Sequence, residues 1–146
     1  MTIIQDRDKI LQLIKTARTI AVVGISPDTQ RASYLVTQRV IGQGIFKVYL
    51  VNPVHAGAEI LGRKVLAFLK DVPEPIDIVD VFRRPDATAP IFEDAIKTGA
   101  KIIWLQPGTE NDEIISRYQD RIMIVKDACL GVMTGQAFAS SKEHVG

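Results

Sequence analysis

The sequence predicts an α/β protein with a Rossmann-like fold of three layers, in which helices cover both faces of a five-stranded parallel sheet of order 3-2-1-4-5. Three observations support this prediction. Short runs of β-branched and other apolar residues alternate with segments whose apolar residues recur at helical spacing. The runs are apolar at most positions, which is typical of strands buried on both faces. Gly, Asn and Pro follow several of the runs directly and predict turns there.

The five strands are expected at residues 20–23, 46–51, 76–82, 101–105 and 122–125. The run at 76–82 carries two carboxylates, Asp77 and Asp80. Either both lie near strand ends, or one is buried and needs hydrogen-bond donors, because an unpaired buried carboxylate is costly. We expect Asp80 to be a structural hydrogen-bond partner rather than a catalytic base.

One helix is expected before the first strand, at about 10–17, and three between the strands, at about 32–42, 86–98 and 109–119. Thr109 is the expected N-cap of the last of these helices. The segment 54–75 gives mixed signals, with room for a short helix at 65–69. The helical pattern fades after Cys129.

The composition fits one domain, which we expect to span residues 1–139, followed by a flexible C-terminal tail at 140–146. The net charge of +1, from 18 basic and 17 acidic residues, gives no field that would hold a nucleic acid. No apolar run approaches the ~20 residues of a membrane span, and no secretory signal is evident. The single cysteine and the two histidines lack metal-ligand spacing, and the absence of a second cysteine favours the reducing cytoplasm.

The residues after the first predicted strand form a candidate phosphate-binding turn. Gly24 ends the strand, the turn-forming residues Ser26 and Asp28 follow, and a helix is expected from Ala32. This layout directs free backbone N–H groups and the positive end of a helix dipole at an anion. The alternative is a packing turn between strand and helix, in which Gly24 lets neighbouring backbone come close.

The turns that follow the predicted strands meet at one edge of a parallel sheet, where ligands of this fold class bind. The usual dinucleotide fingerprint, G-x-G-x-x-G with a later acidic residue, is missing at both ends: Ser26 and Thr29 replace glycines, and the second strand ends in Asn52. The edge instead offers hydroxyl groups and guanidinium groups, which suit a nucleotide with additional phosphate. These residues are Ser26, Ser33, Arg31, Arg83 and Arg84.

Five motifs follow one another along the chain: VGIS at 23–26 with Arg31 and Ser33, VNP at 51–53 with Gly57, VDVFRR at 79–84, WLQPG at 104–108 and DAC at 127–129. Together they resemble the small bacterial and archaeal CoA-binding proteins of the YccU type, over about residues 10–129. The resemblance implies a Rossmann-like CoA-binding domain similar to the N-terminal domain of the succinyl-CoA synthetase α subunit.

The same resemblance assigns the first motif to the phosphates. Gly24, Ile25 and Ser26 would contact the phosphates of CoA. Arg31 and Ser33 would support that contact.

It assigns the later motifs to the rest of the ligand. Asn52 and Pro53 would lie beside the nucleotide, and residues 82–84 (Phe82, Arg83 and Arg84) would border the adenine and its phosphates. Gln106 and Gly108 would lie toward the pantetheine. The ligand implied is therefore coenzyme A or an acyl-CoA.

Cys129 leaves two interpretations open: a buried cysteine that behaves as a small hydrophobic residue, or a residue that meets the CoA thiol. No combination of nucleophile, base and orienting group is evident, so we expect a non-catalytic carrier, sensor or partner of a CoA-dependent enzyme. The alternatives are an NAD(P)-dependent oxidoreductase on the same fold and a CoA- or redox-linked regulatory dimer that uses Cys129. A second copy of the chain and a partner enzyme both stay open as partners.

Overall fold

A computed structural model describes residues 3–139 of the chain. Its strands are β1 (Ile3–Ile4), β2 (Thr19–Val23), β3 (Lys47–Val51), β4 (Glu59–Ile60), β5 (Arg63–Leu66), β6 (Ile78–Val81), β7 (Ile102–Leu105) and β8 (Met123–Val125). Its α-helices are α1 (Arg7–Thr16), α2 (Ala32–Gly42), α3 (Ala89–Lys97), α4 (Asp112–Tyr118) and α5 (Leu130–Ala137). Three short 3-10 helices are η1 (Pro53–His55), η2 (Leu69–Asp71) and η3 (Pro85–Ala87). The predicted tail at 140–146 lies outside the described residues.

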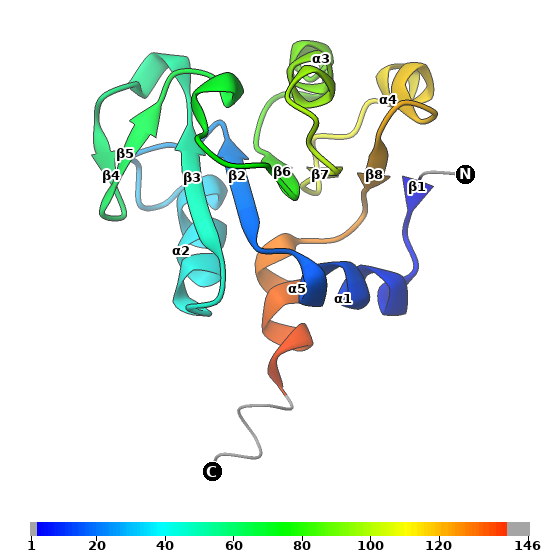
Figure 1. The fold of residues 1–146 in the computed structure, drawn as a ribbon, viewed down its shortest axis with the longest axis horizontal. Helices are drawn as coiled ribbons and strands as arrows, with labels where there is room; N and C mark the ends of the chain where they lie inside the picture. Colours follow the sequence, from blue (N-terminus) through cyan, green and yellow to red (C-terminus); the bar gives the residue numbers. More distant parts are fainter. Residues whose placement is uncertain (1–2, 140–146) are drawn as a thin grey trace.

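The elements form three layers, which confirms the predicted α/β fold class. Helices α1, α2 and α5 cover one face of the sheet, and α3 and α4 cover the other (Figure 1). Each face of the sheet has its own apolar core, one built around Trp104 and Ile14 and the other around Phe92 and Ile103. No helix between residues 3 and 139 has the length and apolar character needed to cross a membrane.

The sheet has eight strands in the described residues, not five, in the order β1-β8-β7-β6-β2-β3-β5-β4. All neighbouring strands are parallel except β4 and β5. The prediction that residues 76–82 form the third strand, beside the second, was wrong: this segment is β6, and it pairs with β2. The third strand of the parallel series is β5, which pairs with β3. With β5 counted as third and β6 as fourth, the central strands keep the 3-2-1-4-5 order.

The hairpin of β4 and β5 explains this difference. A short helix was predicted at 65–69, but the chain reverses at Leu61 and Gly62, whose φ angles are 51° and 75°. Positive φ at both central residues defines the tight turn that joins antiparallel strands. The turn places Ile60 opposite Arg63 and buries Val65 beside β3. Because the hairpin adds β5 to the edge of β3, the next strand crosses back to β2.

Two helices begin differently from the prediction. The N-cap of α4 is Asn111, whose side chain accepts a 3.0 Å hydrogen bond from the N–H of Ile114, and not Thr109. Thr109 is buried, and its hydroxyl donates to the carbonyl of Gln106 at 2.7 Å. Helix α5 occupies the segment where the helical pattern fades. It packs against α2 at Gly131, where a Cβ atom would lie 3.3 Å from a methyl carbon of Val36.

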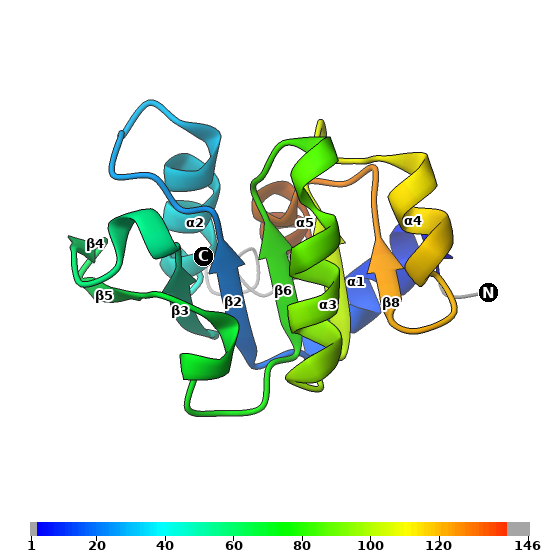
Figure 2. The same ribbon diagram turned by 90° about the horizontal axis from the view of Figure 1, so that it is seen from above.

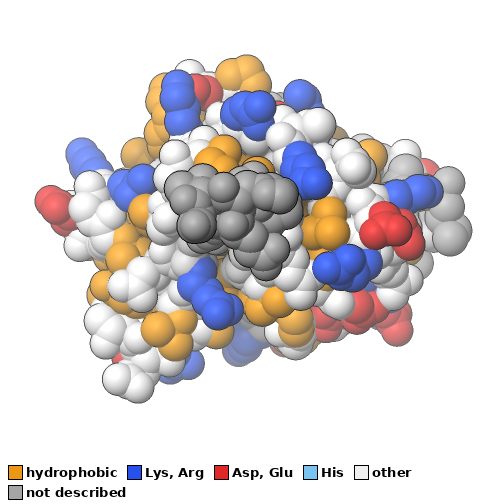
Figure 3. Space-filling view, turned by 90° about the horizontal axis from the view of Figure 1, so that it is seen from below, with side chains coloured by type: hydrophobic (Ala, Val, Ile, Leu, Met, Phe, Trp, Pro, Cys, Tyr) orange, Lys and Arg blue, Asp and Glu red, His pale blue; other side chains and the backbone are white. Residues whose placement is uncertain are grey.

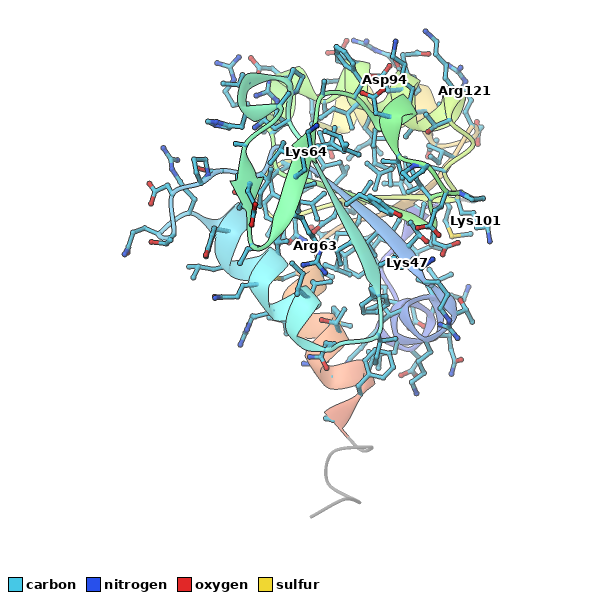
Figure 4. The ribbon with its side chains drawn as sticks, turned by 60° about the vertical axis from the view of Figure 1, so that its left-hand side comes forward. Lys47, Arg63, Lys64, Asp94, Lys101 and Arg121 are labelled. Atoms are coloured by element: carbon cyan, nitrogen blue, oxygen red, sulfur yellow. The ribbon has the colours of Figure 1, made fainter. Side chains whose placement is uncertain are left out.

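The amino-terminal edge of the sheet is held by carboxylates. Asp77 accepts hydrogen bonds from the backbone N–H groups of Arg18 (2.8 Å) and Thr19 (3.0 Å) and pairs with Lys101 at 3.2 Å. Burial opposes ionisation of Asp77, but these partners outweigh it and lower its pKa below the usual value. Lys47, labelled with Lys101 in Figure 4, pairs with Glu74 at 3.0 Å on the same edge. Asp77 therefore lies at a strand end, but Asp80 is fully buried and accepts a hydrogen bond from Gln106, so the interpretation with one buried carboxylate and a donor holds.

Candidate functional site

A cleft opens at the opposite edge of the sheet, beyond the carboxyl ends of β2, β6 and β7. Figure 2 shows the loops that follow these strands gathered at this edge. From β2 the chain adds β3 and β5 on one side, and it then returns to add β6 on the other side of β2. The gap between β2 and β6 is therefore the topological switch point, where ligands of open α/β sheets bind. The cleft, called here the main cleft, has a volume of about 660 Å³. This volume is in the range of small-molecule sites.

The main cleft brings together ten of the thirteen predicted site residues: Gly24, Ser26, Arg31, Ser33, Phe82, Arg83, Arg84, Gln106, Gly108 and Cys129. A second cleft of about 390 Å³, called here the side cleft, contains Asn52 and Pro53. Gly24 and Arg83 line both clefts. The predicted residues thus lie along one continuous edge, with Gly24 and Arg83 where the two clefts meet.

Gly24 allows β2 and β6 to approach each other at their ends. Its φ angle is +95°, and a Cβ atom added there would lie 2.0 Å from the carbonyl oxygen of Phe82. The N–H of Gly24 donates to the carbonyl of Val51, and the N–H of Phe82 donates to the carbonyl of Val23, both at 2.9 Å. The structure shows close approach by neighbouring backbone at this glycine, and phosphate binding by the turn stays a prediction. That approach brings Phe82 and the arginine after it to the cleft wall.

The turn after Gly24 is ordered by its own hydroxyl and carboxylate groups. The N–H of Ser26 donates to the Ser33 hydroxyl oxygen at 3.1 Å, and the N–H of Asp28 donates to the Ser26 hydroxyl oxygen at 3.1 Å. The Asp28 carboxylate accepts from the N–H of Gln30 at 2.9 Å. Ser33 and Ser26 therefore hold the turn in shape, and each keeps a hydroxyl hydrogen that can be donated to a ligand.

Three guanidinium groups surround the main cleft. Arg31 is the N-cap residue of α2, and its side chain makes no capping hydrogen bond. Arg31 lies 3.8 Å from Asp28, and Arg84 lies 3.6 Å from Asp86, but both pairs are exposed and therefore weak.

Arg83 differs from these two, because no ion pair of Arg83 is found among residues 3–139. Its Cδ lies 3.4 Å from the position that a Cβ of Gly24 would occupy. A side chain so placed can turn its guanidinium toward an anion in either cleft.

Asn52 and Ile25 have structural roles that the sequence did not reveal. The Asn52 side chain donates to the carbonyl of Ile25 at 2.9 Å and accepts from the N–H of Val54 at 3.0 Å. These bonds tie the end of β3 to the turn after β2. Ile25 is fully buried in the core and lines neither cleft. The side cleft also has exposed apolar side chains, Val54 and Phe68.

A buried pair lies below the main cleft. Asp80 is fully buried, and its Oδ1 accepts a 2.6 Å hydrogen bond from Nε2 of Gln106. Its burial raises the pKa to about 7, and the bond from Gln106 lowers it only in part. The structural role expected for Asp80 agrees with this bond. Its partner was not predicted, although Gln106 directly follows β7 and lies two residues beyond Trp104, the register partner of Asp80.

Cys129 lies half-buried in the wall of the main cleft, at the N-cap of α5. The residue before it is fixed by Trp104, whose indole N–H donates to the carbonyl of Ala128 at 2.9 Å.

Within residues 3–139, no group of three or more His, Cys, Asp or Glu side chains could hold a metal ion. On the face of α1, α2 and α5, Lys and Arg side chains are dispersed among neutral and apolar groups (Figure 3).

The fold is that of a known class of protein. The chain belongs to the CoA binding domain family, whose model matches residues 18–135. It is 32% identical over 125 residues to the uncharacterized protein YneT of Bacillus subtilis, covering 85% of this chain and 90% of that protein.

Two solved structures show the same fold. A protein of Pyrococcus horikoshii OT3 has 32% identity and a TM-score of 0.84, with 91% of this chain and 92% of that chain covered. An acetyl-coenzyme A synthetase of Ca. Korarchaeum cryptofilum, solved with phosphate and ADP, has 27% identity and a TM-score of 0.63. The match covers 73% of this chain and 25% of the synthetase chain, so the fold is one part of that larger protein.

Proposed function

We propose that this protein is a YccU-type binding protein for coenzyme A or an acyl-CoA, and that it is non-catalytic on its own. The observation that carries the proposal is the meeting of two clefts at Gly24 and Arg83. CoA is a long ligand with phosphates between an aromatic base and a flexible pantetheine arm. A divided cleft with a cation at its junction matches that order of groups.

The phosphates are assigned to the junction. Arg83 supplies a guanidinium that is free of ion pairs in the described chain, and the hydroxyl groups of Ser26 and Ser33 lie in the adjoining turn. The first turn of α2 adds backbone N–H groups and the positive end of its dipole. Charge-assisted bonds of this kind are about twice as strong as neutral ones.

The two ends of the ligand are assigned to the two clefts. The side cleft, with exposed Val54 and Phe68, offers apolar surface to the adenine. The main cleft leads from the junction past Gln106 to Cys129 and suits the pantetheine arm and its thiol. An enclosed acyl pocket is not part of this assignment, so free CoA and short acyl-CoA are both expected ligands.

The residues at the end of β3 support CoA over a nicotinamide dinucleotide. NAD-binding folds of this type place a carboxylate there, which accepts hydrogen bonds from ribose hydroxyls. Here the position is held by Asn52, and its carbonyl and amide groups are already bonded to Val54 and Ile25. We further propose that the protein acts in the cytoplasm, where its one cysteine stays reduced, and that it serves a CoA-dependent enzyme or a second copy of itself.

Calorimetry with the full chain tests the proposal. CoA should bind, and Arg83→Ala should weaken it about tenfold or more, since a hydrogen bond to a charged group contributes ~1.5–3 kcal/mol. Arg121→Ala is the matched control. It also removes an exposed guanidinium, but Arg121 precedes β8 at the opposite edge of the sheet (Figure 4), so CoA affinity should stay within about twofold.

Thermal-shift measurements separate the rival function. CoA and acetyl-CoA should raise the melting temperature, and NADH should leave it unchanged. A shift with NADH and none with CoA would overturn the proposal in favour of an oxidoreductase. Equal loss of CoA affinity in the Arg83 and Arg121 variants would show that the ligand lies elsewhere.

A further inference from the structure

The buried pair of Asp80 and Gln106 lies directly beneath the main cleft. Asp80 has no exposed surface, and Gln106 is only 3% exposed although it lines the cleft. The backbone carbonyl of Gln106 is fixed by the N–H and the hydroxyl of Thr109, at 3.0 and 2.7 Å. Because Gln106 also donates to Asp80 through its side chain and lines the cleft, its amide lies between the carboxylate and the ligand space.

Asp80 has few other partners. Its Oδ2 makes no hydrogen bond within the described part of the chain. Its register neighbours on β2 and β7 are Val22 and Trp104, which are uncharged.

The helices on the same face of the sheet bring no charge to Asp80. The buried residues of α1, α2 and α5 are all uncharged, and α5 has no ionisable residue along its length. The charged groups of the cleft rim are the guanidiniums of Arg31, Arg83 and Arg84, which stay protonated across neutral pH. The side-chain amide of Gln106 is therefore the group that can reorient when the ionisation of Asp80 changes.

The Gln106 amide can take two orientations, one for each ionisation state of Asp80. An ionised Asp80 accepts from Nε2 of Gln106, as in the structure, and the amide oxygen of Gln106 is then the acceptor left for the cleft. A protonated Asp80 has a donor of its own, and it can donate to that oxygen once the amide turns over. The cleft then receives the NH₂ group instead. Burial places the pKa of Asp80 at about 7, so both forms are populated near neutral pH.

We propose that Asp80 is a positioning residue, whose ionisation sets which end of the Gln106 amide faces the main cleft, so that the ionised form favours a ligand with an N–H donor at that point. The proposal rests on the proposed function, because the pantetheine arm of CoA carries secondary amides with such N–H groups. Binding then favours ionised Asp80 and releases a proton. CoA affinity rises with pH through neutrality.

The CoA affinity of the full chain, measured by calorimetry at pH 6, 7 and 8, tests this coupling. If binding lowers the pKa of Asp80 by about one, affinity is roughly fivefold lower at pH 6 than at pH 8. Asp80→Asn is the matched variant, because the introduced amide has a carbonyl that accepts from Gln106 at every pH. Titration of the CoA phosphate monoester near pH 6 affects both proteins equally. The ratio of their affinities should therefore change with pH, and a constant ratio would overturn the proposal.

NMR of the ligand-free protein gives a readout that does not need CoA. The side-chain NH₂ resonances of Gln106 should shift with a midpoint near pH 7 in the native sequence and stay constant in Asp80→Asn. If CoA fails to bind but these resonances titrate, the proposed ligand is wrong and the positioning role stands. Resonances that do not move between pH 5 and 9 would refute the positioning role, whatever CoA does.

Discussion

Replacing Gly24 by Ala should be far more damaging than its single added methyl group suggests. The residue has a φ angle of +95°, and the new Cβ would lie 2.0 Å from the carbonyl oxygen of Phe82. Real Cβ contacts essentially never fall below 3.0 Å, so that carbonyl would have to withdraw by about 1 Å. This carbonyl lies where the ends of β2 and β6 come together, and the main cleft opens beyond these strand ends.

The expected loss of folding stability in Gly24→Ala is the sum of two costs. A non-glycine residue in this backbone region costs ~1–3 kcal/mol. Separating the strand ends also strains the hydrogen bonds from Phe82 to Val23 and from Gly24 to Val51, each 2.9 Å long. Losing one such buried bond costs ~1–3 kcal/mol. The total, about 2–6 kcal/mol, is a large part of the ~5–15 kcal/mol by which domains are stable.

Gly57→Ala is the matched control, because Gly57 has a φ angle of +89° but nothing within 4 Å of the added Cβ. Urea unfolding of both variants should show a loss of ~1–3 kcal/mol for Gly57→Ala and a further ~1–3 kcal/mol for Gly24→Ala. CoA affinity should fall only in the Gly24 variant. Equal losses of stability in the two variants would refute the argument from close approach of the strands.

Two further substitutions test interactions outside the cleft surface. Asp77→Asn should cost about 1 kcal/mol at pH 7; because folding lowers the Asp77 pKa, this difference in urea stability is present above pH ~4 and should fade as the pH drops below the folded pKa. Trp104→Phe should cost roughly 2 kcal/mol, because it leaves a small cavity and frees the carbonyl of Ala128. It should also speed the reaction of Cys129 with a thiol reagent, and an unchanged rate would mean that Trp104 does not hold that loop.

Strands that are buried on both faces were predictable, because their apolar runs exclude most other structures. β2 is an example: all five of its residues are buried. β5 escaped prediction because it has only four residues, of which Arg63 and Lys64 are basic. Its signal was the Gly62 turn between Ile60 and Val65, which have apolar side chains at the spacing of a short hairpin. Missing β5 displaced the following strand in the predicted order.

The grouping of the candidate site residues was predictable from topology, since parallel strands bring their carboxyl ends to one edge. This is why Gly24, Arg83 and Gln106 could be grouped although they are far apart in sequence. The bonds within the site were not predictable, because they depend on register between strands. The pairing of Gln106 with Asp80, and that of Asn52 with the carbonyl of Ile25, each join residues on different strands or turns.

The two outermost strands of the described sheet, β1 and β4, have a consequence for how copies of this protein can associate. Each is only two residues long, and β4 carries Glu59. So short a border presents few free backbone groups to a strand from another molecule, and a charged side chain discourages pairing further. Fibril-like growth by strand addition is thereby disfavoured at both borders. Copies that associate would then do so through contacts between side chains rather than by adding strands to the sheet.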